Sequence, residues 1–202
     1  MLKVSMGGSG VINFDQLKRV RPLLGTLSAL IDYPTETTFS ADHYQQIATD
    51  QSLAKPERKQ LLALFQQLGA ETSLQREVDY SNLFEMNRRY TLYMTYYKMI
   101  DSRQRGSLLA KLKMLYEMFG VSENSSELSD YLPLMLEFLA YGDYLTDYRK
   151  KDLELAFSVI EDGTYNLLKN AVVDADKPYI QLVKLIRQVV GSCVKKEVGA
   201  HE

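Results

Sequence analysis

The chain has few of the residues that build disulfides and metal sites. Its 202 residues include one cysteine, Cys193, and two histidines, His43 and His201. A single cysteine cannot close an intramolecular disulfide, and these three residues do not complete an ordinary Cys/His zinc site. Disulfide scaffolds and zinc domains of that kind are therefore excluded, and the composition fits a reducing compartment such as the cytoplasm.

Excess charge and long apolar runs are lacking as well. The formal net charge is only −2, so no general positive field attracts phosphate backbones, which argues against nucleic-acid binding. Glu137 interrupts the longest apolar candidate, residues 132–141, well short of the roughly 18 apolar residues that span a membrane. Residues 1–10 contain no apolar block of signal-peptide length. We therefore expect a cytoplasmic protein without membrane insertion.

The usual catalytic motifs are absent too. The sequence has no HExxH, no GxSxG and no Walker lysine. Residues 7–10 (GGSG) resemble part of a phosphate loop but lack the following GK[ST], so we interpret them as flexible lead-in. Cys193 falls on the apolar face of a terminal helix and is interpreted as a core residue. A non-enzyme without a cofactor is favoured, although an acid/base pair of carboxylates remains open.

Apolar residues recur three and four positions apart through most of the chain, which indicates amphipathic helices. Capping residues, prolines and glycines mark where these helices begin and end. We expect helices over residues 13–33, after Ser40, over 56–69, over 74–100 with a break near Asn87, over 108–119, after Ser129 or Asp130, over 153–162 with a stop at Asp162-Gly163, and from Asp176 to Cys193.

Alternating apolar and polar runs, which are typical of strands, are nearly absent. No period of 30–50 residues repeats, which argues against a solenoid. The sequence therefore predicts an all-α, single-domain bundle of long antiparallel helices with a linker at 121–128. We place the folded domain at residues 13–197, between a flexible lead-in (1–12) and a C-terminal tail (198–202).

Charge is distributed unevenly along the chain. Between Met114 and Tyr148 there is no lysine or arginine. The acidic residues inside that stretch are Glu117, Glu123, Glu127, Asp130, Glu137, Asp143 and Asp147. Acids beside the most apolar helix suit a basic, amphipathic peptide, with a solvated acidic face as the alternative. Glu137 is either paired internally or faces a groove.

Several sequence blocks resemble one known family. The blocks lie at residues 80–85, 88–93, 101–106 and 128–139, and an early segment at 27–34 ends in Tyr-Pro. In order and spacing they resemble the NarJ-type assembly chaperones of nitrate reductase, within the wider TorD-like group. The departures are mild: Glu85 stands where aspartate is common, and Ser129 where proline is common.

The resemblance implies an all-helical, TorD-like, non-catalytic chaperone of the cytoplasm. Such a chaperone binds the catalytic (alpha) subunit of nitrate reductase, chiefly its N-terminal segment, until the molybdenum cofactor is inserted. It serves nitrate respiration and nitrate assimilation, and it carries no cofactor of its own. The alternatives are a small α-helical enzyme with a carboxylate pair and a structural delta subunit that stays in the reductase complex.

The matching blocks and the helix after Ser129 supply the expected client-binding residues. On that helix a client would place apolar residues against Leu134 or Met135 and a cation near the acids. We expect Asp130→Ala and Glu137→Ala to weaken client binding without unfolding the domain. An exposed apolar groove also favours self-association. The expected client-binding residues are Glu85, Arg88, Tyr93, Arg103, Asp130, Tyr131, Pro133, Met135 and Glu137.

Overall fold

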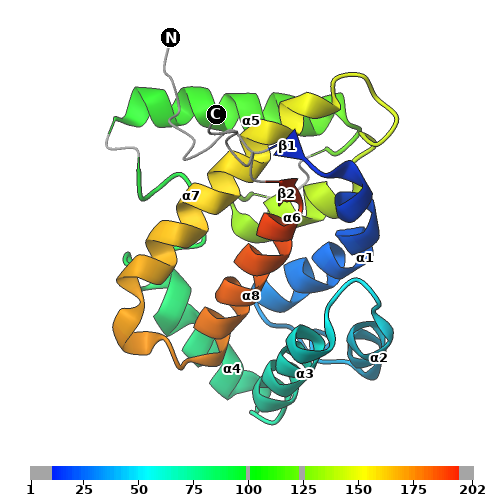
Figure 1. Ribbon diagram of the computed structural model, residues 1–202. Coiled ribbons are helices and arrows are strands. Elements are labelled where there is room, and N and C mark those ends of the chain that lie inside the picture. The colour runs from blue at the N-terminus through cyan, green and yellow to red at the C-terminus, as the bar shows by residue number, and fades with distance from the viewer. Residues whose placement is uncertain (1–10, 99–100, 123–125, 196–202) are drawn as a thin grey trace, which may run out of the picture.

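A computed structural model describes residues 11–98, 101–122 and 126–195 (Figure 1). Eight α-helices account for most of these residues. They are α1 (Phe14–Ile31), α2 (Ala41–Thr49), α3 (Lys55–Gly69), α4 (Ser73–Tyr80), α5 (Ser102–Met118), α6 (Leu132–Tyr141), α7 (Glu154–Asn170) and α8 (Pro178–Ser192). Short elements are the π-helical turn η1 (Ser81–Glu85), the 3-10 turns η2 (Lys150–Leu153) and η3 (Val172–Asp174), and the strands β1 (Val11–Ile12) and β2 (Val194–Lys195). The predicted all-α, single-domain fold is confirmed.

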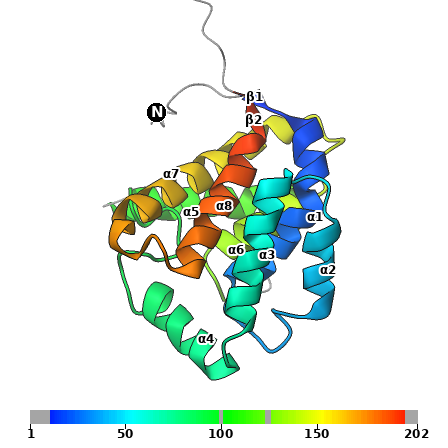
Figure 2. The same ribbon diagram turned by 60° about the horizontal axis from the view of Figure 1, so that its bottom comes forward.

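Helix α8 lies at the centre of the arrangement. It packs against α7 on one side and against α1 and α3 on the other (Figures 1 and 2). Helix α6 packs mainly on α1 and also contacts α7. Seven of the ten residues of α6 are buried, which explains why its sequence is apolar nearly all round.

Helices α1 and α6 are joined by side chains of α1 that bind the backbone of α6. Ser28 Oγ donates to the Pro133 carbonyl at 2.8 Å. Arg21 donates from Nε to the Ala140 carbonyl at 2.7 Å and from Nη2 to the Gly142 carbonyl at 2.9 Å. Carbonyls at the end of a helix lack partners within the helix. Arg21 therefore caps α6 from the neighbouring helix.

The two ends of the described chain meet in a small antiparallel ladder. Val11 pairs with Lys195 and Ile12 with Val194. These pairs include two residues of the predicted lead-in, 1–12, whereas residues 1–10 and the predicted tail, 198–202, lie outside the described residues. Cys193 beside the ladder is fully buried, and burial raises the pKa of its thiol to about 11, which agrees with a core residue rather than a nucleophile.

The helix predicted over 74–100 is wrong beyond Glu85. Residues 86–98 form turns and extended backbone, consistent with a break near Asn87, while residues 99–100 lie outside the described residues. The backbone of this segment pairs with the chain just before α6: Met94 N–H donates to the Asp130 carbonyl and Leu132 N–H to the Leu92 carbonyl, both at 2.9 Å. These bonds between distant parts of the chain replace those of a helix.

The predicted stop at Asp162-Gly163 is also wrong, because α7 continues to Asn170. Gly163 is buried within α7, and a Cβ atom placed there would lie only 2.6 Å from both Cβ and Sδ of Met94. This glycine therefore permits the close approach of the 86–98 segment and does not end the helix.

The predicted starts of two helices shift by one or two residues. Tyr131, and not Ser129 or Asp130, occupies the N-cap of α6, without a side-chain capping bond. Lys177, and not Asp176, occupies the N-cap of α8. In both helices a proline follows in the first turn, where its missing N–H costs nothing.

Replacement of Gly163 by alanine should destabilise the protein by about 1–3 kcal/mol, because the new methyl group overlaps Met94. The matched control is Gly106→Ala in α5, where an added Cβ meets nothing within 4 Å and removal of a helical glycine should stabilise by about 0.5–1 kcal/mol. Urea unfolding of both variants measures the two effects. Equal effects would contradict the packing described for Gly163.

Candidate functional site

Asp130 is a buried anchor between two elements. Its side chain is completely inaccessible to solvent, and its Oδ2 accepts hydrogen bonds from the N–H and hydroxyl of Thr95. Arg105 of α5 forms an ion pair with the same oxygen at 3.3 Å and donates from Nε to Thr95 Oγ1 at 2.9 Å. Asp130 therefore ties the 86–98 segment to α5 and cannot contact a client in this structure.

Two further predicted residues of this region are buried as well. Pro133 and Met135 are both buried, so their side chains pack within the protein. Glu137 is exposed, so it is not paired inside the protein, which was one of the two alternatives left open by the sequence. It faces outward and is not a core carboxylate.

The outer side of α6 presents a narrow stripe of four residues. Tyr131, Leu134, Glu137 and Tyr141 are spaced three, three and four positions apart and therefore share a face. Tyr131 and Leu134 are half-buried, while Glu137 and Tyr141 are exposed. The stripe adjoins α1, because a Cβ atom at Gly25 would lie 2.5 Å from the Tyr141 hydroxyl oxygen. We call these four residues the α6 stripe.

Two tyrosines and two carboxylates gather at the N-terminal end of this stripe. The Tyr131 hydroxyl donates to Asp32 Oδ1 at 2.9 Å, and the Tyr93 hydroxyl donates to Glu127 Oε2 at 2.5 Å. The two rings lie 5.4 Å apart between centroids. We call Asp32, Tyr93, Glu127 and Tyr131 the tyrosine–carboxylate cluster.

The cluster carries negative charge at the surface. Burial, together with the hydrogen bond to Glu127, raises the pKa of Tyr93 to about 12. Burial and the neighbouring Tyr80 and Asp32 also raise the pKa of Tyr131. Both phenols therefore stay neutral and act as donors to the carboxylates at physiological pH.

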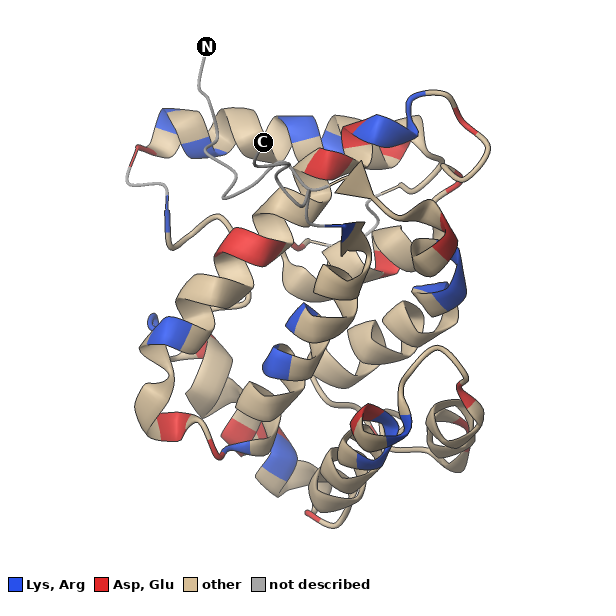
Figure 3. Cartoon of the chain, viewed as in Figure 1, with Lys and Arg blue, Asp and Glu red and all other residues tan. Residues whose placement is uncertain are grey.

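The described residues between 115 and 147 include acidic but no basic side chains (Figure 3). Lysine and arginine are instead found on α5 before this stretch and on α7 and α8 after it. The acid-only stretch seen in the sequence thus includes one carboxylate of the cluster, Glu127, and the carboxylate of the α6 stripe, Glu137.

The remaining predicted residues lie on other elements. Glu85 ends η1, Arg88 lies in the turn that follows, and Arg103 lies in the first turn of α5, all three exposed. Among the described residues no hydrogen bond or ion pair joins them to the α6 stripe. The structure therefore gathers Tyr93, Tyr131 and Glu137 in one region but does not bring Glu85, Arg88 and Arg103 there.

Sequence reasoning missed one member of the cluster and gave another no specific role. Asp32 comes from the end of α1, 99 positions before Tyr131, and Glu127 was noted only as one of several acids. The available signal for Asp32 was its place before Tyr33-Pro34, in a segment that resembles the family. Spacing along the chain does not show that this segment meets the start of α6.

The described residues offer neither a metal site nor a membrane-spanning helix. Within the described ranges, no three His, Cys, Asp or Glu side chains are grouped so as to hold a metal ion. In the same part of the chain, every helix is too short or too polar to cross a bilayer.

Residues 50–181 match the family described as nitrate reductase delta subunit. The chain belongs to this family. The predicted resemblance is thereby confirmed, and the matched range contains α3 to α7, η1 and the first turn of α8. It therefore includes Asp130, the whole α6 stripe and all of the tyrosine–carboxylate cluster except Asp32.

The names of similar proteins are consistent with this family assignment. The chain is 30% identical over 175 residues to the probable nitrate reductase molybdenum cofactor assembly chaperone NarJ of Bacillus subtilis (strain 168), which covers 86% of this chain and 94% of that protein. It is 32% identical over 116 residues to NarJ of Escherichia coli (strain K12), covering 56% of this chain and 49% of that protein. The aligned region thus spans about half the length of the E. coli relative. These relatives are chaperones, which confirms the expectation that the chain is not an enzyme.

Replacement of Asp130 by alanine should destabilise the protein by about 2–4 kcal/mol, because it leaves the donors of Thr95 and Arg105 without their acceptor. The burial of Asp130 argues against the expectation that Asp130→Ala leaves the domain folded. Glu137→Ala is the matched control and should change stability by less than about 0.5 kcal/mol, as an exposed residue. Thermal and urea unfolding compare them. A stable Asp130→Ala variant would show that the buried anchor is dispensable.

Proposed function

We propose that this protein is a NarJ-type assembly chaperone that binds the catalytic subunit of nitrate reductase before its molybdenum cofactor is inserted. The main support is the similarity to NarJ of B. subtilis, which extends over 94% of that chaperone. We place the activity in the cytoplasm, in nitrate respiration and nitrate assimilation. The N-terminal segment of the catalytic subunit is the client region.

The α6 stripe and the tyrosine–carboxylate cluster are the client-binding surface in this proposal. The observation that carries this assignment is the pairing of Tyr131 with Asp32 and of Tyr93 with Glu127 at one end of an exposed stripe. Leu134 offers apolar contact one turn from those acids, and Tyr141 offers it at the far end of the stripe. A basic amphipathic helix matches this pattern, with apolar side chains on the stripe and a lysine or arginine near the carboxylates.

The exposure of the surface sets the character of the interaction. Solvent-exposed ion pairs contribute little each, so the carboxylates determine orientation and partner choice more than affinity. The charged part of the interaction weakens as salt screens it. A client held in this way is released readily, which suits a chaperone that must hand its client on.

The family description favours one alternative, a delta subunit that remains in the mature reductase. Purification of the active reductase from membranes, followed by mass spectrometry, separates the two functions. A chaperone should be absent from the active complex or present well below one copy per catalytic subunit. A constant one-to-one ratio through purification would replace the proposed function with the alternative.

The proposal is tested by calorimetric titration with a synthetic peptide from the N-terminus of the nitrate reductase catalytic subunit encoded in the same genome. We expect Glu137→Gln and Asp32→Asn each to weaken binding about three- to tenfold, because each removes a carboxylate that faces the client. Raising the salt concentration should weaken wild-type binding in the same direction.

The matched control is Glu154→Gln, which removes one exposed carboxylate from the first turn of α7 and should leave the affinity unchanged. Wild-type protein that binds no peptide would refute the proposed client segment. Binding that is reduced equally by all three substitutions would refute the assignment to the α6 stripe and the cluster, since net charge alone would then explain the loss.

A further inference from the structure

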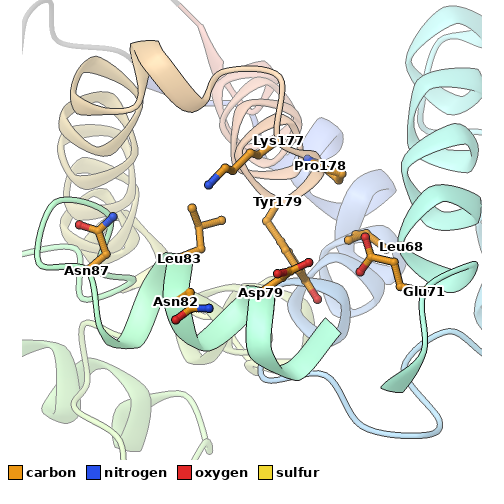
Figure 4. A pocket seen from close by; sticks show the side chains of 9 residues that line it. All are labelled: Leu68, Glu71, Asp79, Asn82, Leu83, Asn87, Lys177, Pro178 and Tyr179. Atoms are coloured by element: carbon orange, nitrogen blue, oxygen red, sulfur yellow. The ribbon is translucent and has the colours of Figure 1, made fainter. Parts of the chain in front are cut away.

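A pocket of about 320 Å³ opens between α3, α4 and α8, apart from the client-binding surface (Figure 4). Buried Leu68, Leu83 and Tyr179 form its inner part, while exposed Asp79, Asn82 and Lys177 lie at its rim. Glu71, Asn87 and Pro178 complete the lining. Two carboxylates, two amides, a phenol and the ammonium of Lys177 thus surround a cavity with an apolar wall.

Two polar atoms of the pocket are buried without a hydrogen-bond partner. Tyr179 is only 3% exposed, and its hydroxyl has no partner, nor has Oε2 of Glu71. Figure 4 shows the Tyr179 side chain pointing toward the part of the pocket where Asp79 and Glu71 lie. Buried polar groups in proteins are normally paired, and an unpaired one calls for a specific explanation.

The two basic residues nearest to the pocket are held mainly by other groups, although Nε of Arg76 is buried without a hydrogen-bond partner. Lys177 forms an ion pair with Asp174 at 3.0 Å, and its ammonium points away from Glu71 and Asp79 in Figure 4. Arg76 donates from Nη1 to the carbonyls of Leu68 and Glu71, at 3.1 and 2.6 Å. Within the described ranges, neither pocket carboxylate has a salt bridge. Burial and the nearby Asp79 raise the pKa of Glu71, against a smaller opposite effect of Arg76.

We propose that this pocket binds the guanidinium group of an arginine side chain on a partner polypeptide. A guanidinium presents five N–H donors in one plane, enough to serve Glu71, Asp79 and the Tyr179 hydroxyl oxygen together. Its methylene stem fits the apolar wall formed by Leu83 and Pro178. The volume lies at the small end of the range for ligand pockets, which matches a single side chain.

Other occupants fit less well. The two carboxylates repel an anion. A divalent metal ion needs more oxygen ligands in fixed geometry, and the described residues contain no three-residue acidic or histidine group for it. A guanidinium supplies both the positive charge and the several donors that the unpaired atoms call for.

The pocket and the client-binding surface are separate. Tyr80 lies between them: its ring centroid is 5.5 Å from that of Tyr179, and its hydroxyl oxygen is 3.0 Å from that of Tyr131. The inference therefore does not rest on the proposed function.

The experiment titrates the full-length protein with N-acetyl-arginine amide, followed by amide chemical shifts. We expect millimolar binding with shifts at Glu71, Asp79 and Tyr179, and at least tenfold weaker binding of the neutral citrulline analogue. Glu71→Gln should weaken arginine binding at least fivefold, and Tyr179→Phe about two- to fivefold. Glu154→Gln, which removes an exposed carboxylate outside the pocket, should bind like the wild type.

Three outcomes overturn the inference. They are no shift at the pocket with the arginine probe, equal binding of the citrulline analogue, and unchanged binding by Glu71→Gln. A client peptide that binds the α6 stripe normally while any of these holds would leave the proposed function intact. If the client peptide does not bind while the arginine probe binds normally, the proposed function is refuted and the inference about the pocket stands.

Stability measurements show that the variants remain folded and give a second readout. A glutamate whose folded-state pKa is raised binds more protons folded than unfolded, so stability falls as pH rises above the ordinary value of 4.5. Glu71→Gln removes this loss, so its melting temperature relative to the wild type should increase as pH rises from 4.5 toward 7. Saturating arginine probe should narrow that difference at pH 7. A melting-temperature difference that depends on neither pH nor the probe would contradict the assignment of Glu71 as a charged group that binds a cation.

Discussion

The arrangement of the surface depends on one buried carboxylate. Asp130 accepts the backbone and hydroxyl donors of Thr95 and the guanidinium of Arg105, so that an irregular segment, α5 and the start of α6 meet at one point. The backbone bonds at Met94 and Leu132 continue this junction. They bring Tyr93 beside Tyr131, and Met94 against Gly163 of α7. Burial of a carboxylate carries a large desolvation penalty, so Asp130 is better understood as fixing the position of its neighbours than as adding net stability.

Local periodicity was sufficient to predict most helices, because each buries one face and that face repeats every three or four residues. It failed at residues 86–98 and at Gly163, where contacts with distant parts of the chain override the local pattern. Thr95 and Asp130 are 35 positions apart, and no spacing rule relates them. A glycine in a helix has the same sequence appearance whether it ends the helix or admits a neighbour.

The candidate site was predictable in outline only. Acidic residues around an apolar helix pointed to the region of the candidate site, but the sequence does not show which carboxylate is buried. Asp130 lies inside and Glu137 outside, although both belong to the same acid-only stretch. Asp32 reaches the cluster because α1 packs along α6, where Ser28 and Arg21 also bind the backbone of α6 and Gly142. The resemblance named the right family, while the positions of individual side chains required the fold.

The pairing of Val11–Ile12 with Val194–Lys195 places the beginning and the end of the described chain next to each other. This ladder connects the segment before α1 with the segment after α8. Local unfolding that begins at either end must therefore break the ladder before it reaches the helices of the core. The arrangement also leaves both ends of the described chain side by side, which is the geometry that tolerates circular permutation. A chain joined at this point and opened in an exposed loop keeps every helix contact that forms the core.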